Sequence, residues 1–145
     1  MAGYSGTPLS KKLGLKSGTQ FLVLNAPQGY LQLLEPLPPF IKITQTLPKK
    51  DSALDTFDTI HAFHTSLEVL ATDFPTYMSL LKQNGAIWIS WYKKSAKKKT
   101  DIDENLLRQL VLRLGVVDVK VAAVDEEWSA LKMVRRVADR RVSVY

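Results

Sequence analysis

The pattern of apolar and polar residues predicts four strands in the first 91 residues of this chain. Residues 21–24 are apolar at every position, which is typical of a strand buried on both faces of a sheet. This run stops before Asn25-Ala26-Pro27, because proline cannot continue a central strand. Further segments with the pattern of a strand lie at residues 40–44, where the side chains alternate, and at residues 56–63 and 86–91.

The segments between these runs predict helices. They lie at residues 27–34, 66–84 and 101–114. Ser66 is a suitable capping residue for the second helix, and Pro75 is expected to break or restart it near Asp73. We expect that helix to end at Asn84 and Gly85, since glycine readily adopts the left-handed conformation that closes helices.

The third helix has the clearest pattern. Asp101 is expected to cap it, with Asp103 and Glu104 in the first turn, where carboxylates favour the positive end of the helix dipole. Gly115 is expected to end it. Its apolar positions recur at helical spacing. They are Ile102, Leu106, Leu107, Leu110, Val111 and Leu114.

Two strands, at residues 116–124 and 128–137, complete the chain. The link between them, Asp125-Glu126-Glu127, is short and polar, so they are expected to form an antiparallel hairpin. The preceding alternation of strands and helices predicts a mostly parallel sheet with helices on its faces. The sequence therefore predicts an α/β fold whose sheet is made mixed by its last two strands.

Length and composition favour one domain. The 145 residues, 46% of them hydrophobic, suffice for a single core. We expect that domain to span residues 18–145, with residues 1–17 as an arm across its surface. The chain has no cysteine, and we find no secretory signal and no apolar run long enough for a membrane span. These features predict a cytoplasmic protein.

Positive charge is concentrated in the last third of the chain. Residues 1–90 carry seven basic and six acidic side chains, whereas residues 91–145 carry thirteen and eight. Such an excess attracts phosphate, nucleic acid or an acidic partner, and it also serves as an ordinary solubilising surface. The basic residues singled out as candidate contacts to phosphate or a partner are Lys97, Lys98, Lys99, Arg135 and Arg136.

A candidate ligand site follows from the predicted sheet. Ligands of open α/β sheets bind at the carboxyl ends of the strands, near the point where strand order reverses. Three strand ends are expected to meet there, and the helix that follows the lysines offers free backbone N–H groups. The candidate ligand-binding residues are Asn25, Gly29, His64, Ser90, Trp91, Lys93 and Lys94.

The alternation of side chains limits what this site can contain. Trp88 and Trp91 are three apart in a strand and point to opposite faces, so at least one is expected in the core. His61 and His64 are also three apart, and no third ligand has suitable spacing, so we predict no metal site. We identify no catalytic residue, because the chain has no nucleophile elbow, phosphate-binding loop or paired carboxylates.

The segments DTFDTIHAF and LLKQNGAIWIS, with the terminal hairpin, resemble class I methyltransferases that use S-adenosylmethionine. The resemblance covers most of the chain as a pattern. It implies a Rossmann-like, methyltransferase-like three-layer sandwich and S-adenosylmethionine as cofactor.

Two positions depart from that pattern. The turn after the first strand, Asn25 to Tyr30, contains one glycine where the family has a glycine-rich turn. The second strand ends in Ile43-Thr44-Gln45-Thr46, with no carboxylate for the ribose hydroxyls. Both departures remove direct contacts to the cofactor.

Four stretches resemble a bacterial family of short proteins of unknown function more closely. They are AGYSGTPLSKKLGLKSG, LNAPQGY, GAIWISWYKKSAKKKTD and VDVKVAAVDEEWSALKMVRR. This resemblance implies the same fold and no assigned reaction.

Three functions remain open. The main hypothesis is a non-catalytic protein that binds a small anionic or nucleotide-like ligand, or a partner protein. The first alternative is a divergent S-adenosylmethionine-dependent methyltransferase. The second is non-specific nucleic-acid binding through the basic half, which would depend strongly on salt.

Overall fold

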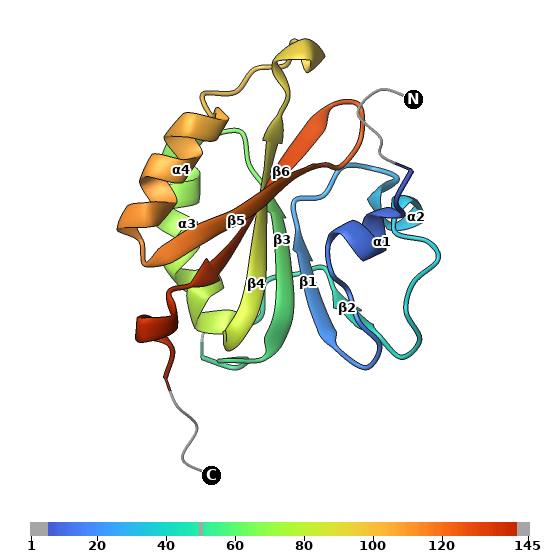
Figure 1. Ribbon diagram of the computed structural model, residues 1–145, viewed down its shortest axis with the longest axis vertical. Coiled ribbons are helices and arrows are strands. Elements are labelled where there is room, and N and C mark those ends of the chain that lie inside the picture. Colours follow the sequence, from blue (N-terminus) through green and yellow to red (C-terminus); the bar gives the residue numbers. More distant parts are fainter. Residues whose placement is uncertain (1–5, 50, 142–145) are drawn as a thin grey trace.

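A single six-stranded mixed sheet organises the protein. The computed structural model describes residues 6–49 and 51–141. The strands are β1 (Gln20–Leu24), β2 (Lys42–Thr44), β3 (Phe57–Phe63), β4 (Leu81–Tyr92), β5 (Val116–Ala123) and β6 (Trp128–Arg135). They lie in the order β2-β1-β3-β4-β6-β5, with β1 to β4 parallel and β6 antiparallel to both its neighbours (Figure 1). The predicted α/β fold and terminal hairpin are confirmed.

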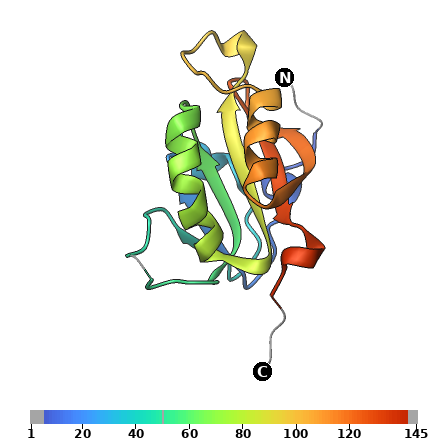
Figure 2. The ribbon, with the colours of Figure 1, turned by 90° about the vertical axis from the view of Figure 1, so that its left-hand side faces the viewer.

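Helices cover both faces of this sheet. They are α1 (Leu9–Lys12), α2 (Tyr30–Leu33), α3 (Leu67–Leu80) and α4 (Glu104–Arg113), with short 3-10 turns at Lys94–Ala96 and Val137–Asp139. Helices α3 and α4 lie side by side on one face, and Figure 2 looks onto them. Helices α1 and α2 lie on the other face, which makes a three-layer Rossmann-like sandwich.

Two apolar clusters fill the spaces between these layers. In β1, Leu22 and Leu24 belong to the cluster under α3 and α4, whereas Phe21 and Val23 belong to the cluster under α1 and α2. Each of these four side chains is buried. Burial on both faces is why this short strand is apolar at every position.

The predicted break in α3 is wrong. The helix runs without interruption from Leu67 to Leu80, with Pro75 inside it. Pro75 is exposed, while Phe74 and Tyr77 on either side of it are buried against the sheet. Their packing offsets the roughly 3 kcal/mol that an internal proline costs an isolated helix.

The predicted helix end at Asn84 and Gly85 is also wrong, because both residues lie within β4. Gly85 has no left-handed conformation. A Cβ atom there would lie 2.7 Å from Leu81 Cδ1 and 3.0 Å from the Asp58 carbonyl oxygen. Glycine is required at this position because β3 approaches it closely, where the pairing of the two strands is irregular.

The cap of α4 is Asp103, not Asp101 as predicted. The Asp103 carboxylate accepts a hydrogen bond from the Leu106 amide at 2.8 Å. The Asp101 carboxylate instead accepts one from the Leu67 amide at 2.7 Å, at the start of α3. The two aspartates therefore serve the beginnings of two different helices.

The segment before β1 is part of the core. We expected residues 1–17 to lie across the surface, and residues 1–5 are outside the described part of the chain. Leu9, Leu13 and Leu15 are buried in the cluster under α1 and α2. The Trp88 indole N–H donates to the Leu13 carbonyl at 3.2 Å, which fixes this segment to β4.

Candidate functional site

A crevice opens at the carboxyl ends of the central strands. Strand order reverses between β1 and β3, the place where open α/β sheets bind ligands. A cavity of about 380 Å³ lies there, and we call it the switch-point crevice. Its lining residues are Asn25, Pro27, Phe63, His64, Thr65, Ser66, Val69, Tyr92 and Trp128.

One wall of the switch-point crevice is aromatic. The Tyr92 and Trp128 rings are stacked, with centroids 3.9 Å apart and planes inclined by 28°. Phe63 meets Trp128 edge to face at 5.0 Å. Phe63 and Trp128 are buried, so Tyr92, which is partly exposed, is the ring of this wall against which a ligand ring can pack.

His64 lines the switch-point crevice and is almost fully buried. Its Nε2 is 2.8 Å from the Tyr77 hydroxyl on α3. Burial lowers the pKa of His64, and the nearby Asp73 carboxylate opposes that shift only in part. The imidazole is therefore neutral at pH 7. His61 and His64 face opposite sides of the sheet, as predicted.

His61 belongs to a buried polar chain behind the site. Its Nδ1 is 2.5 Å from the Tyr30 hydroxyl, and its Nε2 is 2.6 Å from the Ser90 hydroxyl. Burial lowers the pKa of His61 to about 3 and raises that of Tyr30 well above its ordinary value. This chain joins α2, β3 and β4, and it places the candidate Ser90 inside the core instead of in the crevice.

The turn after β1 supplies two of the candidate residues. Asn25 and Gly29 both have positive φ angles, 61° and 88°. The Asn25 side-chain amide donates to the Phe63 carbonyl at 3.3 Å, which ties the turn to the end of β3. Asn25 lines the switch-point crevice, whereas Gly29 precedes α2 and is not among the lining residues.

A second depression of about 340 Å³ lies between the end of β4 and α4, and we call it the α4 depression. Tyr92 lines both cavities. Lys93 and Lys94 lie on its rim, and Trp91 also lines it. Because the Trp91 side chain is buried in the cluster under α3 and α4, Tyr92 is the ring available for stacking.

Lys93 has a structural partner. Its ammonium donates to the Asp125 carbonyl at 2.7 Å, and its backbone amide donates to the Glu127 carbonyl at 2.8 Å. The Asp125 carboxylate in turn accepts from the Glu127 and Trp128 amides. The turn between β5 and β6 therefore braces the start of the lysine loop, residues 93–101.

The remaining candidate lysines lie on this exposed loop. Lys94 is exposed, and in the described part of the chain it has no ion pair. Lys98 forms a half-exposed ion pair with Glu127 at 3.5 Å. Lys97 and Lys99 are exposed as well, so Lys94, Lys97 and Lys99 are the available charges of the lysine loop.

The two candidate arginines have intramolecular partners. The Arg135 guanidinium donates to carbonyls at the end of α3 and the start of β4, those of Met78, Leu81 and Lys82. The Arg136 guanidinium donates to the Leu112 carbonyl at 2.7 Å. Both side chains therefore hold the backbone of this molecule, and their contact with an external phosphate stays a prediction.

Neither a metal site nor a membrane-spanning helix is found in the residues described. No three His, Asp or Glu side chains within 6–49 and 51–141 gather as a metal site would require. No helix in those ranges is long and apolar enough to cross a bilayer.

Two contributors to the site were not among the predicted ligand-binding residues. Trp128 lies 36 positions beyond its stacking partner Tyr92, and Tyr77 was assigned only to a helix. Antiparallel pairing of β4 with β6 brings Tyr92 opposite Trp128. The predicted hairpin would have revealed this pair only if the register of β6 on β4 had been known.

The residues present do not reproduce the usual contacts to S-adenosylmethionine. The turn after β1 has one glycine, and a Cβ atom on Gly29 would have only the Gln32 side chain within 4 Å, at 3.9 Å. No carboxylate follows β2 before the exposed loop at Asp51. The switch-point crevice and its aromatic wall remain suited to a ring, but the carboxylate expected to bind the ribose hydroxyls is missing.

Comparison with known proteins supports the fold. The structure is similar to an Aquifex aeolicus SAM-dependent methyltransferase, with a TM-score of 0.59 and 14% identity over 85% of each chain. It is also similar to a Burkholderia thailandensis N1-methyltransferase with bound 1,6-didemethyltoxoflavin and S-adenosylhomocysteine. That match has a TM-score of 0.57 and 14% identity over 92% of this chain and 79% of the other.

A Bordetella parapertussis protein described as a possible exported protein matches with a TM-score of 0.63. Its identity is 11%, over 89% of this chain and 66% of the other. No protein-family model and no curated protein matches the sequence. The chain thus has a methyltransferase-like fold.

Proposed function

We propose that the protein binds a small ring-containing ligand in the switch-point crevice, with the ring against the Tyr92–Trp128 wall. The observation that carries this proposal is the convergence of that wall and His64 at the point where strand order reverses. Lys94, on the rim of the neighbouring α4 depression, would attract an anionic group of the same ligand.

S-adenosylmethionine-dependent methyl transfer is the second candidate, and the similar structures favour it over binding alone. Several of them are methyltransferases, and one holds S-adenosylhomocysteine. The single glycine after β1 and the missing carboxylate after β2 weigh against this cofactor. In this chain a nucleoside would have to be held chiefly by the aromatic wall and by Asn25.

The experiment is calorimetric titration of the full chain with S-adenosylmethionine, S-adenosylhomocysteine and adenosine. Val69 is half exposed and lines the switch-point crevice, so Val69→Trp fills the cavity without altering the core. Val119, also half exposed, lies on β5 and serves as the matched control in Val119→Trp.

Binding that is lost in Val69→Trp and kept in Val119→Trp supports the crevice as the ligand site. Saturable binding of S-adenosylmethionine, followed by methyl transfer to an acceptor, would favour the methyltransferase. No heat at millimolar concentrations of all three compounds would argue against every nucleoside of this class, and binding that survives Val69→Trp would place the ligand elsewhere.

We also propose membership of the bacterial family of short proteins that the sequence resembles. The stretches carrying that resemblance form the segment before β1, the turn after β1, the lysine loop and the terminal hairpin. Three of these, the turn, the lysine loop and the hairpin, surround the switch-point crevice and the α4 depression. That placement supports a shared ligand-binding role for the family.

A further inference from the structure

A row of three side chains, two of them lysines, crosses β4, β6 and β5 on the face of the sheet that carries α1 and α2. Trp88 on β4 pairs in register with Lys132 on β6, and Lys132 pairs with Lys120 on β5. Register partners point to the same face of a sheet, so the two ammonium groups extend from the face that carries Trp88. The Lys120 ammonium lies 5.9 Å from the centroid of the Trp88 ring.

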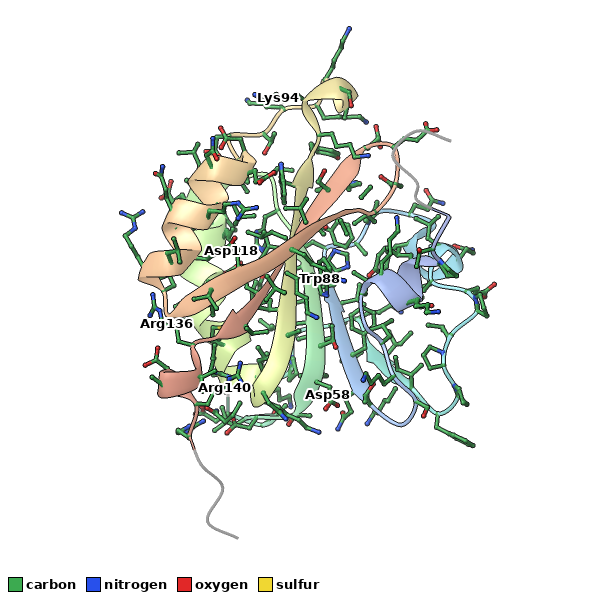
Figure 3. All side chains as sticks on the ribbon, in the orientation of Figure 1. Asp58, Trp88, Lys94, Asp118, Arg136 and Arg140 are labelled. Atoms are coloured by element: carbon green, nitrogen blue, oxygen red, sulfur yellow. The ribbon has the colours of Figure 1, made fainter. Side chains whose placement is uncertain are left out.

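This row borders a separate cavity of about 320 Å³, which we call the amino-edge depression. Lys16, from the segment after α1, lines it together with Lys132. The other lining residues are Leu13, Gly14, Thr19, Asp58, Thr59, Asn84, Gly85 and Ala86. Figure 3 shows Asp58 and Lys94 at opposite ends of the molecule, with Trp88 between them, so this depression is distinct from the switch-point crevice.

The charges at the amino-edge depression are unbalanced. Within the described residues, Lys16, Lys120 and Lys132 form no ion pair. Asp58 is the one carboxylate among the lining residues, and its two oxygens already accept from Lys82 at 3.0 Å and from the Gln20 amide at 2.8 Å.

The three lysines also repel one another. Burial lowers the pKa of Lys132 first, and the positive charges of Lys120 and Lys16 lower it further. An anion between them would relieve this repulsion and favour the charged form of Lys132. The cluster is therefore arranged to gain from a bound anion.

We propose that the amino-edge depression binds the phosphate group of a small phosphorylated ligand. Lys16 and Lys132 line the depression, and Lys120, the register partner of Lys132, adds a third positive charge beside it. Charge from three separate segments suits a dianion with several acceptor oxygens better than a single carboxylate. A depression of this size holds one such group rather than a length of polymer. The proposal is independent of the ligand in the switch-point crevice.

The experiment is an NMR titration of the full chain with inorganic phosphate and with glycerol phosphate, at constant ionic strength set by chloride. The reporters are the Gly14 and Gly85 amides and the Trp88 indole N–H. The indole N–H donates to the carbonyl of Leu13, which directly precedes Gly14 in the chain. The test variant is Lys16→Gln with Lys132→Gln. The matched control, Lys97→Gln with Lys99→Gln, removes two exposed charges from the lysine loop.

We expect saturable shifts of these reporters and a dissociation constant raised about tenfold or more in the test variant, from the loss of two charged contacts. The control should match the wild type. Because Lys16→Arg with Lys132→Arg keeps both charges, this variant should retain binding. It shows whether the glutamine variant loses affinity through its lost charge or through a loss of folding.

Three results would overturn the proposal. One is a linear drift of the reporters that equals the effect of chloride. Another is an equal loss of affinity in the lysine-loop control. The third is that neither phosphate shifts the reporters while a short oligonucleotide binds saturably. That result would assign the lysine row to a nucleic-acid-binding surface.

Discussion

Arg135 and Arg136 are neighbours at the end of β6, and each donates hydrogen bonds at the carboxyl end of a different helix. Arg135 donates to the Leu81 carbonyl at 3.2 Å and the Lys82 carbonyl at 2.7 Å, and also to a carbonyl in the last turn of α3. Arg136 donates to Leu112 in the last turn of α4. Two adjacent side chains therefore join the sheet to the carboxyl ends of both helices on one face, where a cation is favoured.

Arg135→Ala should destabilise the protein more than Arg136→Ala. Arg135 is half-buried, and its loss leaves three carbonyls without a charged donor, which is expected to cost about 1–3 kcal/mol. For the exposed Arg136 the expected cost is about 1 kcal/mol or less. Urea unfolding measures both, with exposed Arg113→Ala as the control. Equal stability of all three variants, with weaker phosphate binding by Arg135→Ala, would contradict the structural role and support the phosphate-contact hypothesis.

The buried His61 predicts a dependence of stability on pH. Its pKa is about 3 in the folded protein and about 6.5 when unfolded, so the unfolded state takes up a proton first as the pH falls. Stability from this group is complete above pH 6.5 and is lost as the pH falls from 6.5 towards 3, at up to roughly 1.4 kcal/mol per pH unit. His64, whose pKa is lowered too, acts in the same direction.

The measurement is urea unfolding of the wild type and of His61→Gln at pH 7 and pH 5. Glutamine can bond to Tyr30 and Ser90 but does not titrate, so the wild type should lose more stability over this interval than the variant. The carboxylates contribute equally to the stability change of both proteins, so their contribution cancels when the two stability losses are subtracted. An identical loss in the two proteins would mean that His61 is not held neutral by the fold.

Single substitutions of Lys93 and Lys94 should have different effects, the first on stability and the second on ligand affinity. Lys93→Ala removes the contact to the Asp125 carbonyl and should lower stability by about 1 kcal/mol. Lys94→Ala should leave stability unchanged and weaken an anionic ligand at the α4 depression by roughly threefold to tenfold. Thermal unfolding and ligand titration of both variants give the answer. A stability loss in Lys94→Ala would contradict its assignment as an available charge.

Gly85→Ala tests the close approach of β3 and β4. The added methyl would meet Leu81 Cδ1 at 2.7 Å and the Asp58 carbonyl at 3.0 Å, and overpacking of this kind is expected to cost about 1–3 kcal/mol. Chemical denaturation provides the measurement, and Asn84→Ala, at the neighbouring position, is the control. A variant as stable as the wild type would show that the strand pair can separate without cost.

The sequence predicted the central strands well, because burial on both faces leaves an uninterrupted apolar run at β1 and at residues 86–89 of β4. It failed where distant packing decides the outcome. Nothing local shows that Pro75 would be held in α3 by Phe74 and Tyr77, or that Gly85 lies against the Asp58 carbonyl.

The place of the candidate site was predictable for a similar reason, and its detailed composition was not. Alternation along β4 is enough to separate Trp88 from Trp91. The stacking of Tyr92 on Trp128 and the lysine row across β5 and β6 both depend on strand register. Register is fixed by the whole fold and has no signature in a short window.

The lysine loop is anchored at both ends by hydrogen bonds to backbone carbonyls, and none of its tip residues takes part in them. At its start, the Lys93 amide donates to Glu127. At its end, the Thr100 hydroxyl and the Asp101 amide both donate to the Thr65 carbonyl, at 3.1 and 3.2 Å. The spacing of the two anchors is therefore independent of the number of residues between them. Doubling the flexible part of such a loop costs only about 0.6 kcal/mol, so the number of charges it presents can change while the sheet beneath it stays the same.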